Sequence, residues 1–282
     1  MRTGPAPCTG WIEPLGRRLC LHEWGDAGAP PLLMFHGVTE TGRLHDALAA
    51  RLAADYHVLC PDMIGRGLSE WSAEPARDYR LTVYAALAEA LIETLPERPV
   101  RILGTSMGGH FAIMVAGGRL MDRVSHLVLN DLGPALPERL LPRMGAAFAT
   151  LPVFADAAEA EAHVRRAYRA IGPADDAEWA GRTAALLRRR DDGRFTLHYD
   201  PAIARQFDSA AEENDQWAAY DRVRAKTLLL RGEASPVLPE DMAAAMLRRG
   251  PRPRLVRFPG CGHAPALNRP EDARLIAAFL AT

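Results

Sequence analysis

Short apolar runs alternate with amphipathic stretches along most of the chain. The runs are short and mostly apolar, as expected for strands buried on both faces of a parallel sheet. The runs cover residues 19–21, 32–35, 57–60, 100–103, 127–129, 227–230 and 255–258. This alternation predicts an α/β fold with a mostly parallel, twisted sheet flanked by helices.

Helical periodicity separates these runs. Apolar residues recur at helical spacing over 82–95, and further helices are expected at about 239–249 and 271–281. Residues 133–224 break the alternation, because they are rich in Ala, Arg and Glu, look helical and have no clear strand pattern. The segment is too long for a crossover loop. We therefore expect a core domain of residues 1–132 and 225–282, with 133–224 inserted as a helical lid.

Composition narrows the class of protein. Of the 282 residues, 48% are hydrophobic and 24% are charged, and the net charge is −1, so nothing attracts the chain to nucleic acid. There is no apolar run near the roughly 20 residues that a membrane span needs, and no secretion signal at the N-terminus. The four cysteines form no CxxC pair and no metal-ligand spacing. These features predict a soluble cytoplasmic protein with reduced thiols and no bound metal.

The sequence around Ser106 has the pattern of a nucleophile elbow. Gly104-Thr-Ser106-Met-Gly108 follows the apolar run at 100–103 and precedes a helical stretch. A G-x-S-x-G motif in this strand–turn–helix context places a serine hydroxyl at the carboxyl edge of the sheet. The motif alone is a weak indication, because Gly and Ser are common in turns.

A second segment offers an oxyanion hole. Two backbone N–H groups must face the oxyanion of a tetrahedral intermediate. Met107, after the serine, supplies one, and Val38, in the loop that follows the run at 32–35, supplies the other. The neighbouring His36 is expected to hold this loop by hydrogen bonds rather than to act as a base.

His263 is the expected general base. It lies in a Gly-rich loop after the run at 255–258, well downstream of Ser106. Such a loop at the carboxyl end of the sheet allows the imidazole to reach the serine, and histidine titrates near neutral pH.

Together these motifs resemble the α/β-hydrolase fold, in particular small bacterial esterases. The resemblance includes the segment 61–69, which matches the family pattern P-D-x-x-G-x-G-x-S, and covers nearly the whole chain outside 133–224. It implies a Ser-His-Asp/Glu triad, no cofactor, and hydrolysis of carboxylic esters.

The acidic member of the triad departs from the family pattern. The family commonly places it after the strand that follows the lid, where this sequence has Ser235 and Pro236. Asp131, at the end of the strand after the nucleophile's helix, is the favoured replacement, and Glu233 is the alternative. Asp131 as a simple turn cap remains the structural alternative.

The expected function is that of a serine hydrolase acting on small-molecule esters through an acyl-enzyme. A lactonase, a thioesterase or a C–C bond hydrolase would use the same residues, and a non-catalytic ligand-binding protein is the alternative from another class. We expect a small-molecule ester as the substrate and no binding to nucleic acid or to membranes. The sequence leaves open whether the chain forms a homodimer.

Overall fold

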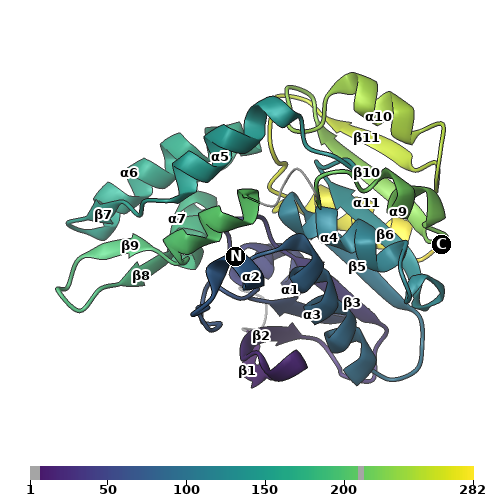
Figure 1. The fold of residues 1–282 in the computed structure, drawn as a ribbon, viewed down its shortest axis with the longest axis horizontal. Helices are drawn as coiled ribbons and strands as arrows, with labels where there is room; N and C mark the ends of the chain where they lie inside the picture. Colours follow the sequence, from purple (N-terminus) through teal and green to yellow (C-terminus); the bar gives the residue numbers. More distant parts are fainter. Residues whose placement is uncertain (1–6, 209–212) are drawn as a thin grey trace.

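The computed structural model describes residues 7–208 and 213–282. Residues 1–6, part of the stretch where the sequence predicts no secretion signal, lie outside the described residues. An eight-stranded sheet forms the centre of the molecule, with the order β1-β2-β4-β3-β5-β6-β10-β11 (Figure 1). The strands are β1 (Cys8–Ile12), β2 (Leu19–Trp24), β3 (Pro31–Phe35), β4 (His57–Pro61), β5 (Val100–Thr105), β6 (Val124–Asn130), β10 (Lys226–Gly232) and β11 (Arg254–Phe258).

The predicted α/β sheet is confirmed. Each of the seven apolar runs falls within one of the strands β2 to β6, β10 and β11. From β4 to β11 all pairings are parallel, whereas β1–β2 and β2–β4 are antiparallel. The apolar runs do not predict β1, because its residues are largely exposed at the edge of the sheet.

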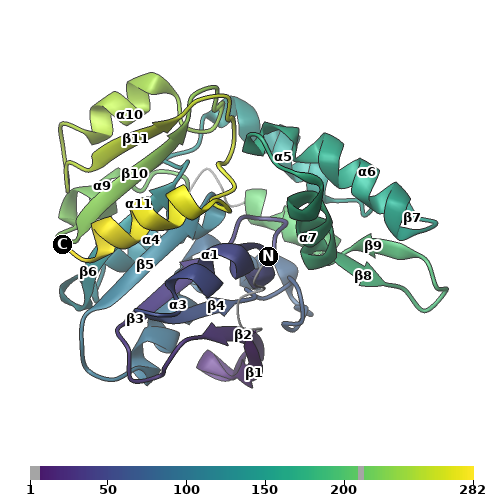
Figure 2. The same cartoon turned by 180° about the vertical axis from the view of Figure 1, so that it is seen from behind.

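Helices cover both faces of the sheet. Figure 2 shows α1 and α11 together on one face, and Figure 1 shows α3, α4 and α9 on the other. The expected helices at 82–95, 239–249 and 271–281 are confirmed with small shifts of their ends. The helices around the sheet are α1 (Asp46–Leu52), α2 (Pro75–Asp78), α3 (Leu81–Thr94), α4 (Met107–Ala116), α9 (Trp217–Arg222), α10 (Glu240–Met246) and α11 (Pro270–Leu280).

Two hydrophobic clusters hold these layers together. Successive strand residues point to opposite faces, so Leu33 and Ile102 join one cluster while Leu32 and Leu103 join the other. All four side chains are fully buried. Burial of a leucine or isoleucine stabilises a fold by about 1.5–3 kcal/mol, so both faces contribute strongly.

The segment between β6 and β10 projects beyond the carboxyl ends of the strands, at the left of Figure 1. The sequence predicts only helices here, yet the structure adds a small three-stranded sheet of order β7-β9-β8. These strands have two or three residues each, too short for a period-two pattern to appear. The elements are α5 (Leu141–Phe148), β7 (Val153–Phe154), α6 (Ala157–Ala167), α7 (Asp176–Leu186), β8 (Leu187–Arg189), β9 (Phe195–Leu197) and the 3-10 helix η6 (Pro201–Phe207).

The last helix of this segment, α9, lies apart from α5, α6 and α7. It packs against α4 on the face of the main sheet, where Arg222 Nε donates to the carbonyl of Gly117. The polypeptide therefore returns to the core before residue 224, the boundary that the sequence analysis sets.

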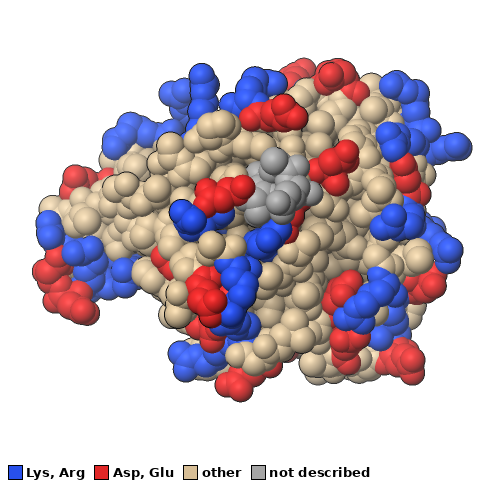
Figure 3. Space-filling view, in the orientation of Figure 1, with Lys and Arg blue, Asp and Glu red and all other residues tan. Residues whose placement is uncertain are grey.

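Charged side chains of both signs are interspersed on the face seen in Figure 3. This face presents no extended field of one sign, as a near-neutral chain predicts. Within 7–208 and 213–282, none of the helices combines the length and the apolar character that a membrane crossing requires.

Candidate active site

Ser106 sits in a sharp turn between β5 and α4. Its backbone has φ 52° and ψ −121°, a conformation that non-glycine residues adopt rarely and only where surrounding contacts enforce it. Two glycines make the turn possible. A Cβ on Gly104 would lie 2.5 Å from the carbonyl oxygen of Gly108, and one on Gly108 would lie 2.3 Å from that of Phe35. Only glycine fits at either position, which is the physical content of the G-x-S-x-G pattern.

His263 meets Ser106 from the loop after β11. Its Nε2 lies 2.8 Å from the Ser106 hydroxyl oxygen, and its Nδ1 lies 2.8 Å from Oδ2 of Asp131. The His263 side chain keeps 22% of its surface exposed, whereas Asp131 is fully buried. The structure thus brings the three sequence-predicted residues into one hydrogen-bonded chain, with each imidazole nitrogen serving one neighbour.

Asp131 follows β6 in a left-handed conformation, φ 59°, which aspartate tolerates better than most residues. Both of its oxygens are occupied. Oδ1 accepts from the backbone N–H of Gly232 at 2.8 Å, and Oδ2 accepts from the Ser235 hydroxyl at 2.6 Å as well as facing His263. These hydrogen bonds fix the orientation of the carboxylate toward His263. Glu233, the alternative acid, is exposed to solvent.

Ser235 occupies the loop position where the family usually carries its acid. In the structure its hydroxyl donates to Asp131 and accepts from the N–H groups of Val237 and Leu238 at 3.2 and 3.1 Å. The side chain of Ser235 therefore holds the carboxylate of Asp131, which follows a different strand, β6. The close match of Gly232-x-x-Ser235 to the family segment was the feature that could have indicated this role.

The loop after β3 lies beside the serine. Val38 and Met107 both line the small cavity onto which Ser106 opens. Met107 is the first residue of α4, so its N–H has no acceptor within the helix. His36 holds this loop, as expected: its Nδ1 lies 2.7 Å from the Gly37 carbonyl, and its Nε2 accepts from the N–H of Met63 at 3.0 Å. Complete burial lowers the pKa of His36 to about 4, so the ring stays neutral.

Arg66 is a site residue that the sequence analysis missed. It is completely buried behind the loop of Val38, whose carbonyl accepts from Arg66 Nε at 2.8 Å. One guanidinium nitrogen also lies 3.3 Å from Met107 Sδ, so a single side chain bridges the two residues of the expected oxyanion hole. The guanidinium further donates to the Ile64 carbonyl, the Tyr84 hydroxyl and Gln206 Oε1. Its place in the P-D-x-x-G-x-G-x-S segment was the only available hint.

The cavity at Ser106 is small, about 40 Å³. Most of its wall is apolar and comes from the core and from the segment between β6 and β10. Its apolar lining residues include Leu81, Leu132, Leu136, Leu141, Met144 and Phe207. Its polar lining residues are Ser106, His110, Gln206, Glu213 and Asn214.

Comparisons with known proteins agree with this geometry. Residues 32–275 match the family model described as the alpha/beta hydrolase family. The chain is 36% identical to a 3-hydroxybutyrate-oligomer hydrolase from Cupriavidus necator, over 95% of this chain and 94% of that one. It is 31% identical to the lipase LipV of Mycobacterium tuberculosis, over 92% and 95% of the two chains.

A solved structure of an alpha/beta hydrolase has the same fold as this chain. An alpha/beta hydrolase from Novosphingobium aromaticivorans superposes with a TM-score of 0.88 at 32% identity, covering 99% of both chains. The relatives from Cupriavidus necator and Mycobacterium tuberculosis are ester hydrolases, so hydrolysis is the activity that the similarity indicates. This chain belongs to the alpha/beta hydrolase family.

Proposed function

We propose that the protein is a serine esterase that cleaves carboxylic esters through an acyl-enzyme. One observation carries the proposal: the hydrogen-bonded chain from Ser106 through His263 to Asp131, with 2.8 Å at each of its two steps. In this arrangement serine is the nucleophile, histidine the general base, and the buried carboxylate orients the ring and stabilises the imidazolium.

Acylation begins when Ser106 Oγ attacks the ester carbonyl carbon and His263 Nε2 takes the hydroxyl proton. The backbone N–H groups of Val38 and Met107 stabilise the negative charge on the carbonyl oxygen. Arg66 holds both residues in place from behind. The ester C–O bond then breaks, His263 gives its proton to the departing alcohol oxygen, and the acyl group remains on Ser106.

Deacylation repeats these steps with water. His263 Nε2 takes a proton from a water molecule, whose oxygen attacks the acyl carbon. The bond from that carbon to Ser106 Oγ breaks, and the proton on His263 returns to Oγ. The free carboxylic acid leaves and the enzyme is restored.

The small cavity and one of the relatives favour short acyl groups. The relative from Cupriavidus necator is named for hydrolysis of 3-hydroxybutyrate oligomers and matches along nearly its whole length. We therefore take short hydroxyacid esters as the first substrates to test. The segment of α5 to α7 and β7 to β9 acts as a lid over this cavity, to which Leu141 and Met144 of α5 contribute.

Lactones, thioesters and C–C bonds remain alternative targets of the same residues, and non-catalytic ligand binding is the alternative of another kind. A fluorophosphonate probe distinguishes a non-catalytic binding protein from the enzymes, because the probe labels only an activated serine. We expect labelling of the wild type and none of Ser106→Ala.

The proposed esterase activity is tested by measuring the hydrolysis of p-nitrophenyl esters of increasing acyl length, and then of 3-hydroxybutyrate oligomers. Ser106→Ala should lower kcat by about 10⁶-fold, the cost of removing a serine nucleophile from a triad. Circular dichroism checks that the variant folds. Comparable hydrolysis by the folded variant would show that another group performs the chemistry.

A further inference from the structure

A second cluster of reactive side chains lies away from Ser106. Cys20 and His22 are two residues apart on β2 and therefore point to the same face of the strand. Asp62 follows β4, the neighbouring antiparallel strand. All three residues are at most 1% exposed. The pairing of β2 with β4 brings together residues that are 40 positions apart in the sequence.

The three side chains converge on one point. His22 Nε2 lies 3.8 Å from Cys20 Sγ and 3.4 Å from Asp62 Oδ2, and the three atoms all lie within 4.8 Å of one another. The N–O separation is long for a hydrogen bond. The other ring nitrogen, Nδ1, is 3.1 Å from the Thr9 hydroxyl. One nitrogen thus faces both reactive neighbours, so the imidazole has no second nitrogen with which to pass a proton between them.

These separations suit a metal ion. Tetrahedral Zn²⁺, with its usual bond lengths, holds nitrogen and oxygen ligands about 3.3 Å apart and nitrogen and sulfur ligands about 3.6 Å apart. The cluster shows 3.4 and 3.8 Å for the same pairs. The donor set of one thiolate, one imidazole and one carboxylate suits Zn²⁺ and similar divalent transition metals.

We propose that Cys20, His22 and Asp62 bind a divalent transition-metal ion such as Zn²⁺, with water as the fourth ligand. Surrounding groups already orient these ligands, as in known metal sites. Thr9 fixes the His22 ring, and Asp62 accepts from the N–H groups of Gly42 at 2.7 Å and Leu68 at 2.9 Å.

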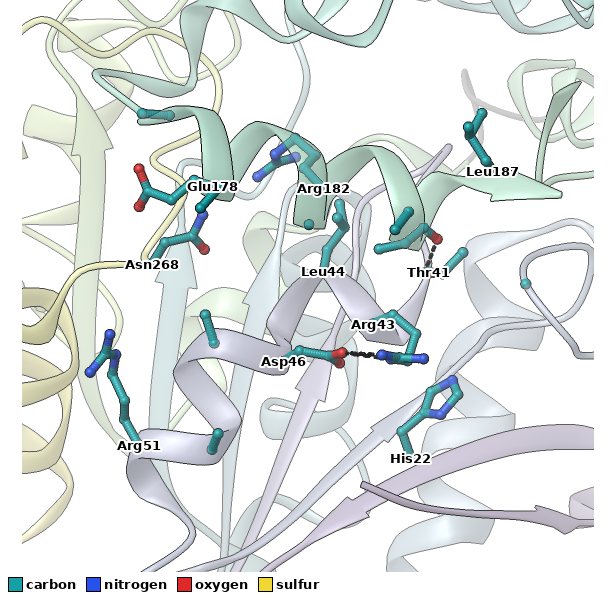
Figure 4. Close-up of a pocket in the computed structure, with 18 of the residues that line it drawn as sticks. His22, Thr41, Arg43, Leu44, Asp46, Arg51, Glu178, Arg182, Leu187 and Asn268 are labelled. Carbon is teal, nitrogen blue, oxygen red and sulfur yellow. Dashed lines mark hydrogen bonds and ion pairs between the residues drawn. The ribbon is translucent and has the colours of Figure 1, made fainter. Parts of the chain in front are cut away.

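A groove gives the ion a path to the cluster. It has a volume of about 1470 Å³, runs between α1 and α7, and is lined by His22 and Asp62 among others. Figure 4 shows His22 at one side of this groove and Arg182 of α7 across it. The nearby cation of Arg43 is directed to Asp46, with Nε 2.6 Å from Oδ2, so its charge is largely balanced.

Binding requires the Cys20 thiol to lose its proton. The ion replaces this proton on sulfur and the proton passes to the buffer, so each ion bound releases one proton. The bound ion joins β2 to the segment after β4 and should therefore stabilise the fold.

The test uses the full chain, first freed of metal with a chelator and then titrated with Co²⁺ and Zn²⁺. We expect one Co²⁺ per chain, a thiolate-to-cobalt charge-transfer absorption that Zn²⁺ abolishes, and a rise in Tm with Zn²⁺. Cys20→Ser should remove the absorption and the rise in Tm. The matched control is Cys8→Ser, which changes an exposed cysteine on the adjacent strand and should keep both.

The wild type decides the question even if Cys20→Ser fails to fold. X-ray absorption of its cobalt complex should show one sulfur ligand among nitrogen and oxygen ligands. Binding without any sulfur ligand, or no binding by folded protein at millimolar Co²⁺, would overturn the proposal. Survival of the charge-transfer absorption in folded Cys20→Ser would overturn it as well.

Discussion

The molecule contains two clusters that join a nucleophile, a histidine and an aspartate. In the first, Ser106 and Asp131 lie on opposite nitrogens of His263, each at 2.8 Å. In the second, Cys20 and Asp62 share one nitrogen of His22, at 3.8 and 3.4 Å. The residue types are nearly the same, but the first arrangement is a chain and the second converges on a point.

This difference in connection has chemical consequences. A proton can leave Ser106 for one nitrogen while the other nitrogen stays bound to the carboxylate, which is what general base catalysis requires. A converging set cannot do this, but it offers three donor atoms to one cation. Access differs too, because the side chain of His263 is 22% exposed and that of His22 is 2% exposed. Residue identity therefore does not reveal function until it is known which atom faces which neighbour.

Apart from removal of the serine nucleophile, the largest expected effect comes from changing the carboxylate of the first cluster. Asp131→Asn should lower kcat for p-nitrophenyl acetate by about 10⁴-fold, because an amide holds the imidazole in the wrong tautomer. Circular dichroism should show an intact fold. The control is Glu233→Gln, which changes an exposed side chain and should retain activity. Near wild-type turnover in Asp131→Asn, with loss in Glu233→Gln, would transfer the role to Glu233.

Each cluster has a serine beside its aspartate, and substituting these two serines should give smaller effects than Asp131→Asn. The Ser235 hydroxyl donates to the Asp131 carboxylate at 2.6 Å, whereas the Ser69 hydroxyl donates to the backbone carbonyl of Asp62 at 2.5 Å. A hydrogen bond to a charged group contributes about 1.5–3 kcal/mol. Because this bond already exists in the resting enzyme, only part of that energy affects kcat, so Ser235→Ala should lower kcat by at most roughly 100-fold. Ser69→Ala should lower Tm and leave kcat within about threefold of the wild type. Equal losses of kcat in the two variants would contradict the distinction between the clusters.

The sequence predicts the first cluster far better than the second. Ser106 and His263 lie in short local patterns, and the strand pattern places Asp131 at the same edge of the sheet. The support from Ser235 arises only because β10 lies beside β6. No local pattern joins Cys20 to Asp62, because their proximity depends on the register between β2 and β4.

In the fold, too, features that leave a local sequence pattern were predicted, whereas features that depend on contacts between distant residues were not. Strands buried on both faces give continuous apolar runs and were all predicted, whereas the exposed edge strand β1 and the short strands β7 to β9 were not. Arg66 was missed for a related reason. Its partners Val38, Met107 and Gln206 come from three distant parts of the chain, so only the folded arrangement reveals its role.

The smallest expected effect concerns His36, a third histidine, which is completely buried. Its pKa falls from 6.5 to about 4 on burial, so protons bind the unfolded chain before they bind the folded one. The stability that this neutral ring contributes is complete above about pH 6.5 and is lost as pH falls toward 4. The free energy of unfolding should decrease by at most about 1.4 kcal/mol per pH unit for this one group.

Urea unfolding at pH 7 and pH 5 measures this loss. His36→Gln lacks the titrating ring, so its stability should change less between the two pH values than that of the wild type, even if it is lower at pH 7. Burial also lowers the pKa of His45 to about 4, which gives His45→Gln as a comparison with the same direction of effect. An equal pH dependence in the wild type and His36→Gln would mean that the pKa of the ring is the same in the folded and the unfolded protein. The ring of the folded protein would then carry a proton at pH 5. The Nε2 atom would then no longer accept from Met63, and the loop that carries Val38 would have to be held in another way.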